Sequence, residues 1–316
     1  MLKTNAIGDT ILLSAVVGDL RRALPGVDVV LFVGPANAAA AELVEGVKVV
    51  KLPLTRPDRA VRAVRDENVD VMLDFGAWPR LNAVLAATSG ARYTVGFKTR
   101  GQGRHYCYDL AVEHSADLHE LDNYRALAEA FGVDATSLPS FTPPGTTELP
   151  DRPYVVFHLW PGGYRSELKE WPTASWRELA GRVGENGTMI VLTGAPADRE
   201  RTETAAAAIG AVNAAGEYTF PQLVDVLAGS ECVVSVNTGV MHLAAATGAP
   251  TVGLNGPTAA HRWGPIGARA TSVSSTYAGC GYLNLGSEYR GQREDCMEGI
   301  AVDAVVAAMD EVSSRG

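Results

Sequence analysis

The strongest chemical pattern lies in 231-ECVVSVNTGVMHLAAATGAPTVGLNGPT-258, where two buried apolar runs each end in a polar turn. Asn237 or Thr238 can cap the helix expected to start at Gly239, and the free N–H groups at such a helix start favour an anion such as a diphosphate. His242 lies on the first turn of the same helix. An ordinary cap beside a core histidine is the alternative, but two turns that meet at one sheet edge favour a ligand site.

A second candidate, 158-HLWPGGYRSELKEWP-172, follows another buried run. Gly162 and Gly163 permit a ligand to approach the backbone closely, and Lys169 offers a flexible positive charge that suits phosphate. A loop with a solvated lysine is an equally open interpretation. The chain contains no Gly-x-x-x-x-Gly-Lys-Ser/Thr, no Gly-x-Gly-x-x-Gly and no Gly-x-Ser-x-Gly, which argues against kinases, ATPases, standard dehydrogenases and hydrolases.

The third candidate is Asp9, which follows Gly8 between a very short apolar run and the long amphipathic stretch 10–23. Asp is a usual helix cap, and capping is the favoured interpretation of this residue taken alone. At a strand end that faces an interdomain cleft, however, the same carboxylate can act as general base toward an acceptor hydroxyl. Because no Asp-x-Asp occurs and the histidines lack a paired spacing, no metal is expected.

Short apolar runs alternate with amphipathic stretches along the chain, as in parallel sheets covered by helices on both faces. Strands are expected at 28–34, 48–52, 69–76, 154–159, 188–194, 231–236 and 250–255, and helices at 10–23, 36–45, 57–68, 79–88, 117–131, 173–185, 197–209, 220–229, 239–247 and 302–314. The proline-rich segment 137–153 interrupts this alternation and is interpreted as a linker. The pattern predicts an α/β fold of two Rossmann-like, doubly wound domains that face a central cleft.

Bulk composition narrows the class of function. The 316 residues are 47% hydrophobic and carry a net charge of −9, which suits a globular protein and argues against a nucleic-acid binder. No apolar stretch is long enough to span a bilayer and no secretion signal is recognisable, so a cytoplasmic protein with at most peripheral membrane contact is expected. Cys280 and Cys296 flank a polar insert and are expected to be two buried or free thiols.

Together these segments resemble the heptosyltransferase family (glycosyltransferase family 9), whose two-domain fold is called GT-B. The likeness extends over nearly the whole chain. Five motifs in the family's order carry it: 3-KTNAIGDTILLSAVVGDLRRALPG-26, 119-HELDNYRALAEAFG-132, 169-KEWP-172, the 231–258 segment and 295-DCMEGIAVDAVVAAM-309.

The resemblance implies a role for each candidate. Asp9 matches the family's catalytic base, and Lys169 matches the lysine that contacts the donor phosphates. The implied donor site comprises Gly162, Gly163, Lys169, Gly194, Asp198, Asn237, Thr238, Gly239, Val240, Met241 and His242, and the implied acceptor site comprises Gly8, Arg80 and His119. Domain 1–145 would bind the acceptor and domain 146–316 the nucleotide sugar, with the last helix a candidate to pack back on the first domain. The family usually has Asp at the position of Asn237, which calls the standard heptose donor into question.

These roles predict inverting transfer from a nucleotide sugar, by analogy an ADP-linked heptose or a related sugar, with neither metal nor other cofactor. Two acceptors compete: the lipopolysaccharide inner core, and a soluble saccharide or aminocyclitol of natural-product (antibiotic) biosynthesis. The charge of −9 favours the second, because an anionic lipid surface would repel the protein. A nucleotide-sugar epimerase would consume donor without acceptor, and a pure binding module would release no nucleoside diphosphate. A monomer or weak homo-oligomer is expected.

Overall fold

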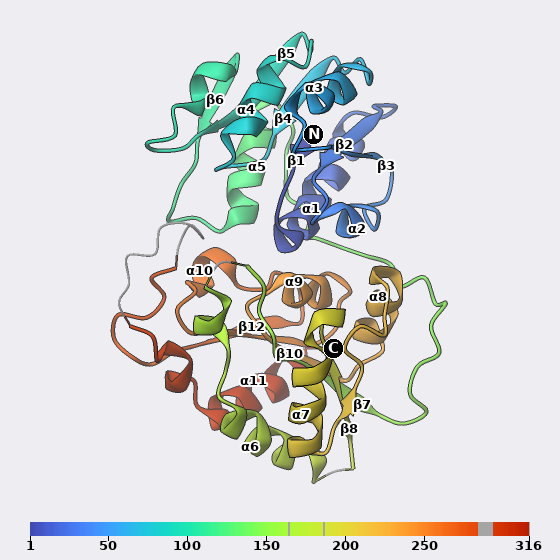
Figure 1. Ribbon diagram of the computed structural model, residues 1–316, viewed down its shortest axis with the longest axis vertical. Coiled ribbons are helices and arrows are strands. Elements are labelled where there is room, and N and C mark those ends of the chain that lie inside the picture. Colours follow the sequence, from blue (N-terminus) through green and yellow to red (C-terminus); the bar gives the residue numbers. More distant parts are fainter. Residues whose placement is uncertain (164, 186, 284–292, 316) are drawn as a thin grey trace. The chain divides into compact units, whose positions relative to one another are not determined.

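The computed structural model describes residues 1–163, 165–185, 187–283 and 293–315. The chain divides into two compact units, Met1–Pro139 and Ser140–Gly316, coloured from blue to green and from green to red in Figure 1. Each unit contains a six-stranded sheet in which every pair of neighbouring strands is parallel. The prediction of two doubly wound α/β domains is therefore confirmed at the level of the fold.

In unit 1 the sheet order is β3-β2-β1-β4-β5-β6. Helix α1 contacts both α2 and α5, and α4 packs on β4. The elements are β1 (Leu2–Lys3), α1 (Ile7–Ala23), β2 (Val29–Val33), α2 (Ala38–Ala41), β3 (Val47–Lys51), α3 (Pro57–Arg65), β4 (Val71–Asp74), α4 (Arg80–Ala87), β5 (Tyr93–Lys98), η1 (Arg104–Cys107), β6 (Leu110–Glu113) and α5 (Glu120–Ala130).

In unit 2 the sheet order is β12-β11-β10-β7-β8-β9. The elements are β7 (Tyr154–His158), η2 (Ser166–Lys169), α6 (Thr173–Gly184), β8 (Met189–Thr193), η3 (Pro196–Asp198), α7 (Arg199–Ile209), β9 (Val212–Asn213), α8 (Phe220–Ala228), β10 (Cys232–Val236), α9 (Gly239–Ala246), β11 (Thr251–Asn255), α10 (Ala260–Trp263), β12 (Ala270–Ser274), η4 (Cys296–Gly299) and α11 (Val302–Ser314). The last helix, α11, contacts β10, β11, β12 and α6 of its own unit.

The strands that the sequence pattern missed are β5, β6, β9 and β12. Three of them end a sheet, and none of β6, β9 and β12 has a fully buried residue, so their apolar pattern is weak. Strand β5 is buried from Thr94 to Phe97, but this run is short and glycine interrupts it. Apolar periodicity in the sequence predicts the strands that are largely buried and misses the partly exposed strands at the sheet edges.

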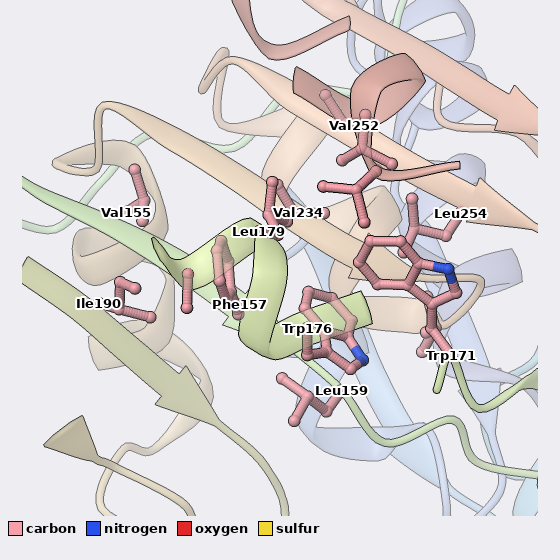
Figure 2. Close-up of a cluster of buried hydrophobic side chains, with 14 of the residues drawn as sticks. Val155, Phe157, Leu159, Trp171, Trp176, Leu179, Ile190, Val234, Val252 and Leu254 are labelled. Atoms are coloured by element: carbon pink, nitrogen blue, oxygen red, sulfur yellow. The ribbon is translucent and has the colours of Figure 1, made fainter. Parts of the chain in front are cut away.

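The core of unit 2 determines how the loop after β7 is held. Phe157 on β7, Trp171 and Trp176 pack as aromatic neighbours, with ring centroids 5.1 Å apart for Phe157–Trp176 and 4.9 Å apart for the two tryptophans (Figure 2). The Trp171 indole N–H donates to the carbonyl of Ile300 at 3.1 Å. Burying an aromatic side chain of this size contributes about 2–3 kcal/mol. Trp171 therefore anchors the preceding segment, which carries Lys169.

The expectation of free thiols at Cys280 and Cys296 is wrong, because these two residues form a disulfide. Both lie beside the turn after β11: Gly281 donates its N–H to the carbonyl of Gly256, and Met297 packs against Gly256. Contacts with the turn after β11 thus bring the two cysteines together, and the spacing of the cysteines in the sequence does not reveal these contacts. Part of the polar insert between them, 284–292, lies outside the described residues.

Candidate active site

Each sheet has one point at which its strand connections diverge to opposite sides. In unit 1 this switch point lies between β1 and β4, and in unit 2 it lies between β7 and β10. Open α/β sheets bind ligands beyond the carboxyl ends of the strands at such a point, where the loops on either side run apart and leave a crevice. The candidate residues of both units follow these strand ends.

In unit 1, Asp9 is the third residue of α1, directly after β1. Its carboxylate lies 2.6 Å from the ammonium of Lys3, and the side chains of Lys3 and Asp9 are 3% and 17% exposed. The cap position is Ala6, and the helix has no side-chain cap, so helix capping does not account for Asp9. Ala6 has a φ of 63°, a backbone conformation that costs about 1–2 kcal/mol for alanine and that clusters at functional turns.

A buried polar network, which the sequence pattern did not reveal, underlies this strand end. Asp74 at the end of β4 accepts hydrogen bonds from Arg104 at 2.5 Å and from the hydroxyl of Tyr108 at 2.6 Å. Asn82 donates to the same carboxylate at 3.3 Å and accepts from Thr4, which follows β1. Burial raises the pKa of Asp74, while Arg104 opposes that shift. A charged residue that ends a buried run, as in 69-VDVMLDFG-76, was the available signal.

The predicted acceptor residues lie on the same, carboxyl edge of the unit 1 sheet. Gly8 is the second residue of α1, next to Asp9, and Arg80 is the exposed first residue of α4, after β4. His119 precedes α5 and caps it, because its Nδ1 accepts a hydrogen bond from the N–H of Leu121 at 3.1 Å. His119 is 8% exposed, so this side chain already has a structural role.

In unit 2, Thr238 caps α9, which follows β10. Its hydroxyl accepts a hydrogen bond from the N–H of Val240 at 3.1 Å, and Gly239 is the first helical residue. His242 is 6% exposed, on the first turn. Met241 is fully buried and packs against Gly253 of β11, so only its backbone can face a ligand. The helix start therefore offers backbone N–H groups and a positive dipole end.

Asn237, the residue before this cap, has its amide nitrogen fully engaged. The Nδ2 group donates at 2.8 Å to Oδ1 of Asn255 and at 2.8 Å to the backbone carbonyl of Trp263. Asn255 ends β11 and Trp263 ends α10. The turn after β10 is thus tied to the two elements that follow it along the chain.

Lys169 and Gly162, two residues predicted to share a phosphate loop, are in contact. The ammonium of Lys169 donates to the carbonyl of Gly162 at 2.8 Å, and burial lowers the pKa of this lysine. Gly163 has a φ of +88°, which glycine adopts at little cost. In the same loop Arg165 has a φ of 48° and pairs with Glu294 at 2.9 Å.

Asp198 follows β8 but is occupied by protein groups. One carboxylate oxygen accepts from the N–H of Ala195 at 2.9 Å, and the other accepts from Arg201 at 2.6 and 3.0 Å. Arg201 stacks on Trp160, 4.1 Å from the ring centroid, and also pairs with Glu170, the residue after Lys169. Gly194 packs against Asp198 and Ala215. These contacts connect the loops after β7 and β8.

Two doubly wound parallel units, each with polar turns at its switch point, define a protein of the GT-B class. The profile of glycosyltransferase family 9 (heptosyltransferase) matches residues 59–282. The chain belongs to this family.

Similar proteins agree with this assignment. The chain is 36% identical over 147 residues to lipopolysaccharide heptosyltransferase 1 of Pseudomonas aeruginosa, and the alignment spans 46% of this chain and 41% of that relative. It is 28% identical over 282 residues to the Escherichia coli K12 protein of the same name, with 82% and 87% covered. The solved structure of the E. coli ADP-heptose LPS heptosyltransferase II superposes with a TM-score of 0.79 at 20% identity, covering 99% and 98% of the two chains. Within the described residues no helix is long and apolar enough to cross a membrane.

Proposed function

We propose that this protein transfers a heptosyl group, with inversion and without a metal ion, from ADP-heptose to a hydroxyl of an anionic lipopolysaccharide core acceptor. The family assignment supports the reaction class. The names of the similar proteins, ADP-heptose and lipopolysaccharide heptosyltransferases, support the donor and the acceptor. We further propose that the amino-terminal domain, 1–145, binds the acceptor and that 146–316 binds the donor.

In the proposed reaction the Asp9 carboxylate takes the proton of the acceptor hydroxyl while that oxygen attacks the anomeric carbon of the donor. The bond between the anomeric carbon and the diphosphate oxygen breaks, and ADP leaves with the bonding electrons. Lys169 and the N–H groups that start α9 stabilise the charge that develops on the diphosphate. Gly8, Arg80 and His119 are assigned to the acceptor, and the loops at Gly162–Gly163, Gly194–Asp198 and Asn237–His242 to the donor.

The observation that carries this proposal is the Lys3–Asp9 pair. A carboxylate on the first turn of α1 is partly exposed at the carboxyl edge of the sheet, and a buried ammonium 2.6 Å away holds it in one position. Ala6, which is exposed and directly precedes the helix, has an unfavourable positive φ. A purely structural Lys3–Asp9 ion pair would not explain why this strained conformation is kept. A fixed and accessible carboxylate is what a general base requires.

The charge distribution weakens the argument for an aminocyclitol acceptor, because the acidic excess is concentrated outside the proposed acceptor domain. Residues 1–139 contain 15 Lys and Arg against 17 Asp and Glu, so most of the net charge of −9 belongs to residues 140–316. The segment 75–108 contains no acidic residue at all. It includes exposed Arg80 and Arg100, which follow β4 and β5 at the same edge as Asp9. The overall charge was therefore a poor guide to the acceptor side.

The test is product analysis with purified protein, ADP-heptose and heptose-free lipopolysaccharide core as acceptor, followed by mass spectrometry and an assay for ADP. We expect ADP and heptosylated core in equal amounts, and no loss of rate in the presence of EDTA. Consumption of donor without acceptor would instead indicate an epimerase. Transfer only to a soluble aminocyclitol would overturn the acceptor assignment, and ADP-heptose binding without ADP release would indicate a binding module.

A further inference from the structure

The side chain of Asn237 lies against two hydrogen-bond acceptors, Oδ1 of Asn255 and the backbone carbonyl of Trp263. The carbonyl of Trp263 is a backbone group and can only accept, so the side chain of residue 237 must present a donor to it. The orientation of Asn255 is fixed independently, because its Nδ2 donates at 3.2 Å to the backbone carbonyl of Gly253 and at 3.2 Å to Ser272. Its Oδ1 therefore faces Asn237 as a second acceptor.

A single primary amide satisfies both acceptors, because its NH₂ group carries two hydrogens. A carboxylate at position 237 carries none and would face two carbonyl oxygens at hydrogen-bond distance. A protonated carboxyl group carries only one. Asn255 is 1% exposed, so solvent cannot easily replace the lost donors there. A carboxylate at position 237 would therefore be electrostatically unfavourable in this chain.

The contacts of Asn237 join three segments at the carboxyl edge of the unit 2 sheet. Asn237 precedes the Thr238 cap of α9, Asn255 ends β11, and Trp263 ends α10. Helix α10 is one turn long, and its close packing leaves no room for a side chain at Gly264, where a Cβ would lie 2.7 Å from the carbonyl of Ala260. So short a helix has little stability of its own and depends on such tertiary contacts.

We propose that Asn237 is a positioning residue: its amide holds α10 and the end of β11 against the turn at the start of α9, and so fixes the N–H groups that receive the donor diphosphate. In this role Asn237 acts on the framework of the site through Asn255 and Trp263. This inference rests on the proposed function only in taking residues 237–242 as the diphosphate site. With Nδ2 engaged, Oδ1 is the atom of this side chain left for a ligand hydroxyl.

The test compares Asn237→Asp with Asn237→Ala across pH 5 to 8.5, by ADP titration calorimetry and by thermal unfolding. At pH 8 we expect N237D to bind ADP about tenfold more weakly than wild type and to melt roughly 3–8 °C lower. The introduced carboxyl faces two acceptors, so its pKa should be raised in the folded state. Its protonated form donates one hydrogen bond, and both deficits should therefore shrink as the pH falls through that pKa.

N237A has no titrating group, so its deficits should stay constant relative to wild type across the same pH range. Asn68→Asp introduces the same charge at an exposed turn of unit 1 and should leave ADP binding as in wild type across this pH range. The proposal is overturned if N237D binds ADP as tightly as wild type at pH 8, or if its deficits do not change with pH. Because ADP binding and melting need no acceptor, these results are independent of whether transfer occurs; where it does, N237D should raise the donor KM more than it lowers kcat.

Discussion

The two switch points are built from different chemistry. In unit 1 the strand ends carry full charges in pairs, Lys3 with Asp9 and Arg104 with Asp74. In unit 2 the corresponding strand ends carry neutral groups: the Thr238 hydroxyl, the amides of Asn237 and Asn255, and His158, whose pKa burial lowers to about 4. The proton transfer proposed for Asp9 needs a carboxylate held in place, whereas a bound anion needs donors that no carboxylate competes for.

Among the tests of this contrast, the replacement Asp9→Asn has the largest expected effect. It removes the base but keeps the size and shape of the side chain, so we expect kcat to fall by about 10²–10⁴-fold. ADP affinity should stay unchanged, because the diphosphate is assigned to unit 2. Steady-state kinetics and calorimetry measure the two quantities. Asp58→Asn, on the exposed first turn of α3, is the matched control. Near-normal transfer by D9N would remove Asp9 from the mechanism.

The next test concerns the buried pair of unit 1. Arg104→Met leaves the Asp74 carboxylate without its partner in a fully buried position. We expect a loss of about 3–5 kcal/mol in the free energy of unfolding, measured by urea titration. The double replacement of Arg104 by Met and Asp74 by Asn should recover part of that loss, because it leaves no buried charge and the amide oxygen can still accept from Tyr108. If the single variant were as stable as wild type, the network would not hold the strand end under Asp9.

The contrast was only partly visible in the sequence. Asp9, Lys169 and Thr238 could be selected as candidates because each follows a buried apolar run, and the family motifs name the same positions. The partners could not be identified: Arg104 meets Asp74 across 30 residues, and Trp263 meets Asn237 across 26. Such contacts depend on which strands are neighbours in the sheet. The strand order cannot be predicted without the edge strands, and these have little periodic apolar signal. The prediction of thiols at Cys280 and Cys296 failed for the same reason, since contacts with the turn after β11 bring these residues together.

The neutral, buried His158 at the switch point of unit 2 predicts a distinct pH dependence. Burial lowers the pKa of His158 from 6.5 to about 4, so between these values the unfolded chain binds a proton that the folded protein does not. The contribution of His158 to stability should therefore decrease as the pH falls from 6.5 to about 4, by about 3 kcal/mol. Urea titrations at several pH values should show a flatter profile for His158→Gln than for wild type. His261→Gln, at an exposed position, should leave the profile unchanged.

The smallest expected effect belongs to Lys169, whose positive charge the donor side is proposed to use. Its ammonium already donates to the carbonyl of Gly162, so the loop positions the charge before any phosphate arrives. Lys169→Met keeps the aliphatic stem and should lower kcat/KM for the donor by about 10–100-fold, as expected for loss of one charge-assisted hydrogen bond. Lys48→Met removes an exposed lysine of unit 1 and should have no effect. If K169M and wild type showed equal kcat/KM, the neutral groups at the start of α9 would be sufficient to stabilise the diphosphate. The donor side would then need no lysine charge, in sharper contrast to the charged pairs of unit 1.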